Sequence, residues 1–86
     1  MKLIGKLIEG TTVVNEKVVE KEDMDISFRD LLEANLIDLC KELDISVPLW
    51  LKRNTTEFVK FKKTFFTKDQ FVESVKFDKF EIKIEY

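Results

Sequence analysis

The sequence contains no histidine and a single cysteine, Cys40, among its 86 residues. Histidine titrates near neutrality and is the commonest metal ligand, so its absence removes the usual general base and the usual zinc ligand. One cysteine cannot form an internal disulfide. With two glycines, one proline and 44% hydrophobic residues, the chain is neither collagen-like, low-complexity nor disordered. We expect a single small globular domain over residues 1–86.

Long apolar runs are also lacking. The first residues, Met1–Ile8, carry a lysine every few positions, and every uncharged apolar run is only a few residues long. A membrane span needs about 20 apolar residues, and a signal peptide also needs a continuous apolar stretch. We expect no membrane partner and, with one cysteine, a reducing cytoplasm. Abundant Lys, Glu, Phe and Ile beside scarce Ala, Arg and Gly is typical of an AT-rich bacterial or phage genome.

No motif for a phosphate, a metal or a nucleophile is present. Gly5 and Gly10 fit neither the GxxxxGK[ST] pattern nor the GxGxxG pattern. The acidic run Glu20–Asp25 lacks the glycine and the ligand spacing of a calcium loop. Cys40 has no histidine to activate it, which predicts a core or boundary residue. We therefore expect no cofactor, no metal and no enzymatic activity.

Strands are predicted at both ends of the chain. Residues 2–9 and a segment within Thr12–Glu22 are rich in Leu, Ile and Val, which favours a β-hairpin with its turn at Gly10 and Thr11. The pair Asn15 and Glu16 is either a bulge or a second turn. Residues 79–86 alternate apolar and charged side chains, which predicts a strand with one buried face and one wet face.

One long amphipathic helix is predicted from Phe28 to Leu43. Ser27 is a suitable N-cap, and Asp30 stands in the position that completes a capping-box-like start. Asn35 lies beside the apolar stripe and is expected to bond to a neighbouring backbone group. At 100° per residue the stripe falls within one arc of the helix and comprises Phe28, Leu32, Leu36, Leu39 and Leu43.

Shorter helices are expected between this helix and the last strand. Ser46 is expected to cap a short helix that runs through Leu51, with Trp50 in the core. Asn54 and Glu57 suggest a capping box for a helix to about Phe66, although Glu57–Phe66 also partly fits a strand. Thr67 is expected to start a short helix to about Ser74.

The predicted elements together make an α+β domain. They are an N-terminal β-hairpin, one long amphipathic helix, one or two shorter helices and a C-terminal strand. We expect a small antiparallel sheet with the helices packed on one face, because the last strand has only one apolar side.

Charge is unevenly distributed along the chain. Residues 1–47 carry 6 basic and 11 acidic side chains, whereas residues 48–86 carry 9 basic and 6 acidic ones. Within segment 50–68 the bases alternate with aromatic residues, a composition that single-strand-binding proteins use. The candidate binding residues are Lys52, Arg53, Lys60, Lys62, Lys63 and Lys68.

Two functions are therefore weighed. The favoured hypothesis is a non-enzymatic interaction module that binds another protein or associates with itself, because exposed sheet edges can accept a strand. The alternative is single-stranded nucleic-acid binding through segment 50–68. The sequence pI of about 5.2 argues against nucleic acid.

Overall fold

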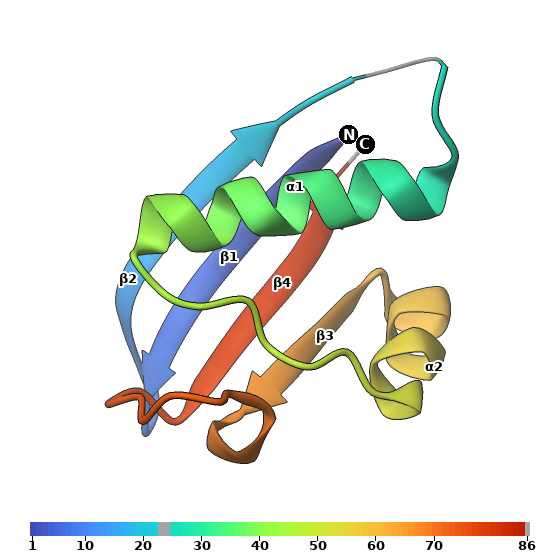
Figure 1. Ribbon diagram of the computed structural model, residues 1–86. Coiled ribbons are helices and arrows are strands. Elements are labelled where there is room, and N and C mark those ends of the chain that lie inside the picture. The colour runs from blue at the N-terminus through green and yellow to red at the C-terminus, as the bar shows by residue number, and fades with distance from the viewer. Residues whose placement is uncertain (23–24, 86) are drawn as a thin grey trace.

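The computed structural model describes residues 1–22 and 25–85, and its strands form one antiparallel sheet (Figure 1). The order of strands across the sheet is β2-β1-β4-β3. The predicted α+β class with a small antiparallel sheet is confirmed. Asp23 of the acidic run and Tyr86 of the C-terminal alternation lie outside the described residues. The strands are β1 (Lys2–Glu9), β2 (Thr12–Glu20), β3 (Lys63–Thr67) and β4 (Lys79–Glu85).

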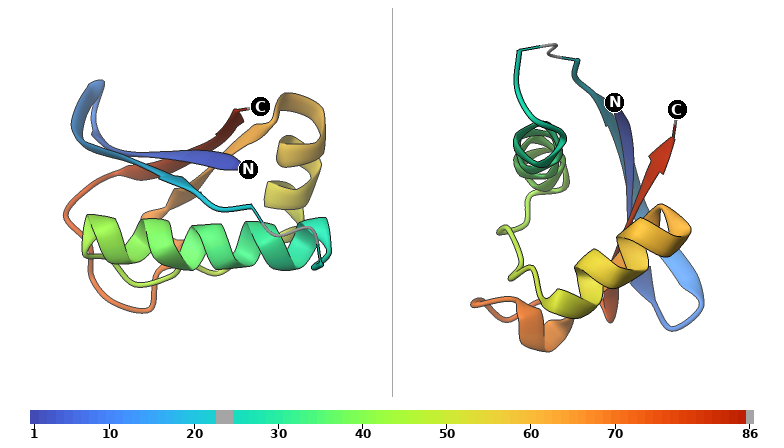
Figure 2. Two further views of the ribbon diagram at one scale, coloured as in Figure 1. Left: turned by 90° about the horizontal axis from the view of Figure 1, so that it is seen from above. Right: turned by 90° about the vertical axis from the view of Figure 1, so that its right-hand side faces the viewer.

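The two helices cover different parts of the sheet. Helix α1 (Phe28–Leu43) lies across one face and packs on β1 and β2 (Figure 2). Helix α2 (Lys52–Phe61) packs against β3, at the edge of the sheet. Only α1 therefore spans the face that the alternation along β4 predicts to be buried, and α2 closes its β3 side.

The first two strands turn at Gly10 and Thr11, where Gly10 has a positive φ of 60°. Glycine adopts that conformation without steric cost. The pairing of β1 with β2 shifts register between Leu7 and Ile8, which leaves Val14 as an extra residue on β2. The irregularity expected near Asn15 is thus a β-bulge, not a second turn.

Helix α1 has the predicted bounds. The hydroxyl of Ser27 accepts a hydrogen bond from the backbone N–H of Asp30, with 3.2 Å between N and O. The helix ends at Asp44, which adopts a left-handed conformation and donates its N–H back to the last turn. Phe28 was expected in the buried stripe, but it is 53% exposed. It is the first helical residue, and that end of α1 projects past the strands (Figure 1).

The core lies between α1 and the inner face of the sheet. An ideal Cβ on Gly5 of β1 would lie 2.7 Å from Leu39 Cδ2 and 3.0 Å from Phe80 Cε1, so only glycine lets α1 approach this closely. Phe66 and Phe80 are fully buried, with ring centroids 5.6 Å apart. The buried aliphatic and sulfur side chains are Leu3, Leu7, Leu36, Leu39, Cys40, Leu43, Ile82 and Ile84.

The segment between α1 and α2 is extended, and the helix expected from Ser46 through Leu51 is absent from it. The backbone of Leu49 is bonded to Gln70 instead. Its N–H donates to the carbonyl of Gln70 (2.7 Å), and its carbonyl accepts from Gln70 Nε2 (2.9 Å). These tertiary bonds hold the backbone of Leu49 in place, and residues 45–51 cross the molecule as an extended strap.

The region from Asn54 to Phe66 divides into two elements. Helix α2 starts earlier than predicted, with Leu51 as its N-cap, and Asn54 Oδ1 accepts from the Leu51 N–H (2.9 Å). The helix ends at Lys62, which has a positive φ of 60°, and strand β3 follows. The expectation of a helix to Phe66 is wrong beyond Phe61, because β3 pairs with β4 and places Phe66 opposite Phe80.

The predicted helix to Ser74 is shorter than expected. A 3₁₀ turn, η1 (Lys68–Gln70), follows Thr67, whose backbone N–H donates to Gln70 Oε1 (3.1 Å). The start at Thr67 is as predicted, but the chain leaves the helical conformation at Phe71. Phe71 is buried in an edge-to-face contact with Phe77, at 5.3 Å between centroids. Burial of that ring outweighs the weak helical preference of a short segment.

We predict that Gly5→Ala and Leu39→Ala are non-additive. Gly5→Ala should destabilise the fold by about 1–3 kcal/mol through overpacking, and Leu39→Ala by about 2–5 kcal/mol through a cavity. In the double variant the new methyl group occupies space that Leu39 vacated, so the total loss should be smaller than the sum. Urea unfolding of the four proteins measures this coupling. Simple additivity would mean that Gly5 and Leu39 are not in contact.

Candidate interaction surface

Arg53, one of the six candidate binding residues, is held inside the protein's own hydrogen-bond network. Its Nη1 donates to the carbonyl of Phe65 (3.2 Å) and to Glu57 Oε1 (3.4 Å), and its Nη2 donates to Gln70 Oε1. Its guanidinium carbon lies 4.9 Å from the centroid of the Phe65 ring. Arg53 therefore fixes α2 against β3 and is not available as a free cation.

A buried pair of amide side chains completes this network. Asn54 Nδ2 donates to Thr64 Oγ1 (2.8 Å) and to the Phe65 carbonyl (3.0 Å). Asn54 Oδ1 accepts from Gln70 Nε2 (2.9 Å) as well as from the Leu51 N–H. Both amides are at most 1% exposed. Sequence reasoning missed Gln70 and assigned Asn54 to the N-cap, since their partners lie in other segments of the chain.

Lys68 lies apart from the other candidate residues. It follows β3 in η1, and its Nζ is 3.7 Å from Asp78 Oδ1. The second oxygen of Asp78 accepts a hydrogen bond from the backbone N–H of Gly10 (2.6 Å). Lys68 and Asp78 therefore belong with the β1–β2 turn, and Lys68 is not part of a basic site on α2.

The remaining four candidates lie on α2 or directly after it, are exposed, and have no ion-pair partner in the described part of the chain. Lys63 stands opposite Lys83 in the pairing of β3 with β4, so a fifth lysine joins them. Phe61 is 63% exposed beside Lys60 and Lys62 in the sequence. The structure thus keeps Lys52, Lys60, Lys62 and Lys63 as candidates and adds Lys83.

The outer face of the sheet carries both signs of charge in alternation. Lys2 of β1 stands opposite a glutamate on each neighbouring strand, and so does Lys6. Opposite charges in facing positions stabilise a sheet and cancel its long-range field. The charges balance where β1 pairs with β2 and β4, whereas Lys63 and Lys83 stand opposite one another at the β3 edge of the same face. The opposed pairs are Lys2 with Glu20 and Glu85, and Lys6 with Glu16 and Glu81.

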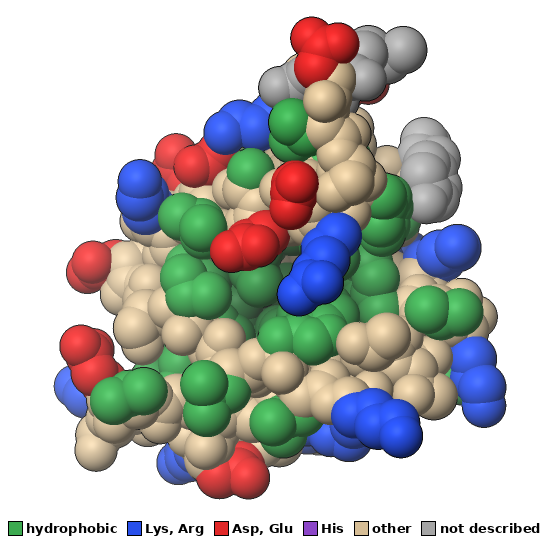
Figure 3. All heavy atoms as spheres, turned by 45° about the vertical axis from the view of Figure 1, so that its right-hand side comes forward, with side chains coloured by type: hydrophobic (Ala, Val, Ile, Leu, Met, Phe, Trp, Pro, Cys, Tyr) green, Lys and Arg blue, Asp and Glu red, His purple; other side chains and the backbone are tan. Residues whose placement is uncertain are grey.

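Apolar side chains gather between the two helices. Figure 3 shows hydrophobic side chains in a hollow on this side of the molecule, with charged side chains around it. Leu32 and Trp50 are half-buried against the core there. Leu51, Thr55 and Val59 follow at four-residue spacing and so share one side of α2. Leu51 is 44% exposed and Val59 is 70% exposed.

The α1 flank of the hollow follows from helix geometry. Asp38 Oδ2 lies 2.9 Å from Lys21 Nζ, and Lys21 directly follows the end of β2. The side of α1 that carries Asp38 therefore faces β2. Arg29, Glu33 and Ile37 lie on the opposite flank of the buried stripe, which faces α2. We define the interhelical surface as the apolar residues Ile37, Trp50, Leu51 and Val59 together with the charged residues beside them, Arg29, Glu33, Lys52 and Lys62.

Trp50 anchors the interhelical surface. Its indole N–H donates to Thr55 Oγ1 (2.8 Å), and its ring makes edge contacts with Phe58 and Phe66, at 5.8 and 5.7 Å between centroids. The sequence places Trp50 in the core, and the structure finds it half-buried at the boundary. A tryptophan with one satisfied polar atom and one partly open side is typical of a binding surface.

The side chains that could take part in catalysis or metal binding are buried, bonded within the fold or not clustered. Cys40 is 1% exposed, and burial raises the pKa of its thiol to about 12, so it is a poor nucleophile at neutral pH. Asn35 Nδ2 donates to the Leu31 carbonyl (3.0 Å), as expected, and its Oδ1 has no partner within the described residues. Across residues 1–22 and 25–85, no cluster of three or more acidic, Cys or His side chains could hold a metal ion.

No family model matches the chain, and neither a curated protein nor a solved structure is similar to it. Within the described residues, neither helix has the length and apolar character needed to cross a bilayer. Function must therefore be argued from the geometry of these surfaces.

We predict that Asn54→Ala destabilises the domain far more than its neighbour Thr56→Ala. Removing the Asn54 amide takes one hydrogen bond from each of Gln70 Nε2, Thr64 Oγ1 and the Leu51 N–H in a largely buried site, which should cost about 2–4 kcal/mol. Thr56 is exposed, and its hydroxyl donates to the Lys52 carbonyl (3.3 Å) within its own helix. Thermal unfolding of both variants checks this. Equal melting temperatures would show that the network does not hold α2 in place.

Proposed function

We propose that the protein is a non-enzymatic interaction module that binds an acidic, amphipathic segment of another protein on the interhelical surface. The observation that carries the proposal is the division of α2 into two sides. Its inner side is fixed by Arg53, Asn54 and Phe58, whereas Val59 is exposed on its other side and Leu51 is exposed at its N-cap. An exposed apolar patch with a charged rim is the usual anatomy of a protein-binding surface.

On the α2 side of the patch, the charge favours an acidic partner. Lys52 begins α2 next to Leu51, and Lys62 ends it three positions after Val59. Neither lysine has an ion-pair partner within the described residues. Carboxylates on a bound segment would meet these ammonium groups, while its apolar residues cover Trp50 and Val59. Such complementarity increases the association rate and selects the partner.

The same lysines are weaker support for a nucleic acid. Stacking of successive bases needs several open rings, and among the described residues of segment 50–68 only the Phe61 ring is largely exposed. Phe65 already has Arg53 at 4.9 Å and Lys79 at 5.2 Å from its ring centroid. The mixed charges of the outer sheet face and the net charge of −2 also disfavour a polyanion.

We also propose a reducing cytoplasm as the compartment, in a bacterial or phage setting. The single Cys40 is buried and unpaired, so the fold does not depend on an oxidising environment. The bacterial or phage origin rests on composition alone.

The proposal predicts that Val59→Glu weakens partner binding without unfolding the protein. The full chain is immobilised and used to capture proteins from a lysate. Val59→Glu should reduce the captured amount of a specific partner about tenfold. Lys62→Glu should weaken binding of the same partner by reversing a charge. Val72→Glu should leave that binding unchanged, because Val72 is 89% exposed on another part of the molecule. An acid-rich segment of that partner, made as a peptide, should then bind the full chain directly.

Three outcomes would contradict the proposal. Capture that is equal for wild type and Val59→Glu would place the binding surface elsewhere. A dimer in sedimentation that Val59→Glu dissociates would show that the surface binds a second copy of the chain. Salt-sensitive binding of a labelled single-stranded oligonucleotide, lost in Lys62→Glu, would assign the surface to nucleic acid.

A further inference from the structure

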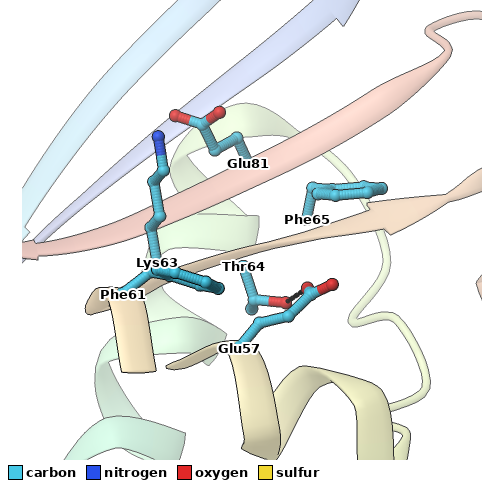
Figure 4. A pocket seen from close by; sticks show the side chains of 6 residues that line it. All are labelled: Glu57, Phe61, Lys63, Thr64, Phe65 and Glu81. Carbon is cyan, nitrogen blue, oxygen red and sulfur yellow. Dashed lines mark hydrogen bonds between the residues drawn. The ribbon is translucent and has the colours of Figure 1, made fainter. Parts of the chain in front are cut away.

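A small cavity lies where the end of α2 meets β3 and β4 (Figure 4). Its volume is about 160 Å³. A cavity of about 150 Å³ holds a benzene molecule, so a planar group of a few heavy atoms fits this space. The rings of Phe61 and Phe65 line it on two sides, and Glu57 approaches from α2. The full lining is Glu57, Phe61, Lys63, Thr64, Phe65 and Glu81.

The cavity presents unused acceptor atoms. Glu57 Oε1 accepts from the Thr64 hydroxyl (2.6 Å) and from Arg53 Nη1 (3.4 Å). Both bonds use the same oxygen, so no group within residues 1–22 and 25–85 donates a hydrogen bond to Oε2. Glu81, from β4, forms no ion pair within the described part of the chain. Two carboxylates with free acceptor positions thus stand beside two aromatic rings.

The protein's own residues show which chemistry this corner accepts. The Arg53 guanidinium lies 4.9 Å from the Phe65 centroid and bonds to Glu57, so ring and carboxylate together already hold one guanidinium. The Lys79 ammonium is 5.2 Å from the same ring. Aromatic faces attract cations, and a guanidinium also stacks on a ring while it donates to a carboxylate in its own plane.

We propose that this cavity is a subsite for the guanidinium group of an arginine side chain from a binding partner. The group stacks on the exposed Phe61 ring, beside the Phe65 ring that Arg53 and Lys79 already contact, and donates to Glu57 Oε2 and to the Glu81 carboxylate. Lys63 is the one cation in the lining, and Figure 4 shows its side chain reaching toward Glu81. Lys63 therefore competes with the incoming guanidinium. The subsite stands on its own geometry and does not require the acidic segment proposed for the interhelical surface.

The test is a titration of the full ¹⁵N-labelled chain with acetyl-arginine amide, followed by amide chemical shifts. Shifts should concentrate on Thr64, Phe65 and Glu81, with a dissociation constant on the order of 10 mM for so few exposed contacts. Acetyl-citrulline amide has the same shape without the charge, and it should bind at least about fivefold more weakly. At constant ionic strength, these results support a charge-selective guanidinium site.

Variants locate the site within the corner. Glu81→Gln should lower the affinity for acetyl-arginine amide about threefold, and Lys63→Met should raise that affinity by a similar factor. Glu85→Gln is the matched control, because Glu85 is exposed on the same strand and does not line the cavity. Equal binding of the citrulline probe, an unchanged affinity in Glu81→Gln, or an absence of shifts at the cavity would each overturn the assignment. These readouts contain no protein partner, so they stand or fall separately from the capture experiment.

Discussion

The hydrogen bonds between the side chains of Asn54 and Gln70 join four segments that are separate in the sequence. Asn54 belongs to α2 and bonds to Leu51 before the helix and to Thr64 in β3. Gln70 belongs to η1 and bonds to the carbonyl of Leu49 in the strap. Each buried donor or acceptor without a partner would cost free energy, so the four segments are stable only in this relative arrangement. The position of α2, and with it the interhelical surface and the cavity beside β3, depends on this pair.

This arrangement determines which charges are available to a partner. Arg53 projects toward β3 and donates hydrogen bonds to Phe65, Glu57 and Gln70. It is therefore not available to a partner, although it is as basic as its neighbour Lys52. Adjacent positions on α2 point about 100° apart around the helix axis, so Arg53 faces β3 while Lys52 faces solvent. The lysines that remain unpaired lie next to exposed apolar residues, which is why a mixed apolar and acidic partner fits better than a uniform polyanion.

The close approach of α1 to the sheet is a second constraint. Gly5 leaves space for Leu39, and the helix therefore settles on β1 and β2. The inner face near β4 and β3 is left to Trp50, Phe58 and α2. The hollow between the helices results from this division of one sheet face between two unequal helices (Figures 1 and 3).

The sequence alone determined the α+β class, the bounds of α1 and the start of the 3₁₀ turn at Thr67. In each case the signal is local, since a cap residue and an apolar period act within a few positions of the chain. Tertiary structure decided the extended strap at Leu49, the end of α2 at Lys62 and the strand that follows it. In those places the backbone bonds to distant segments, the strap to Gln70 and β3 to β4. A local sequence pattern cannot indicate such distant partners. The same reason separates Arg53 and Lys68 from the other candidate residues, because their partners were fixed only when the chain folded.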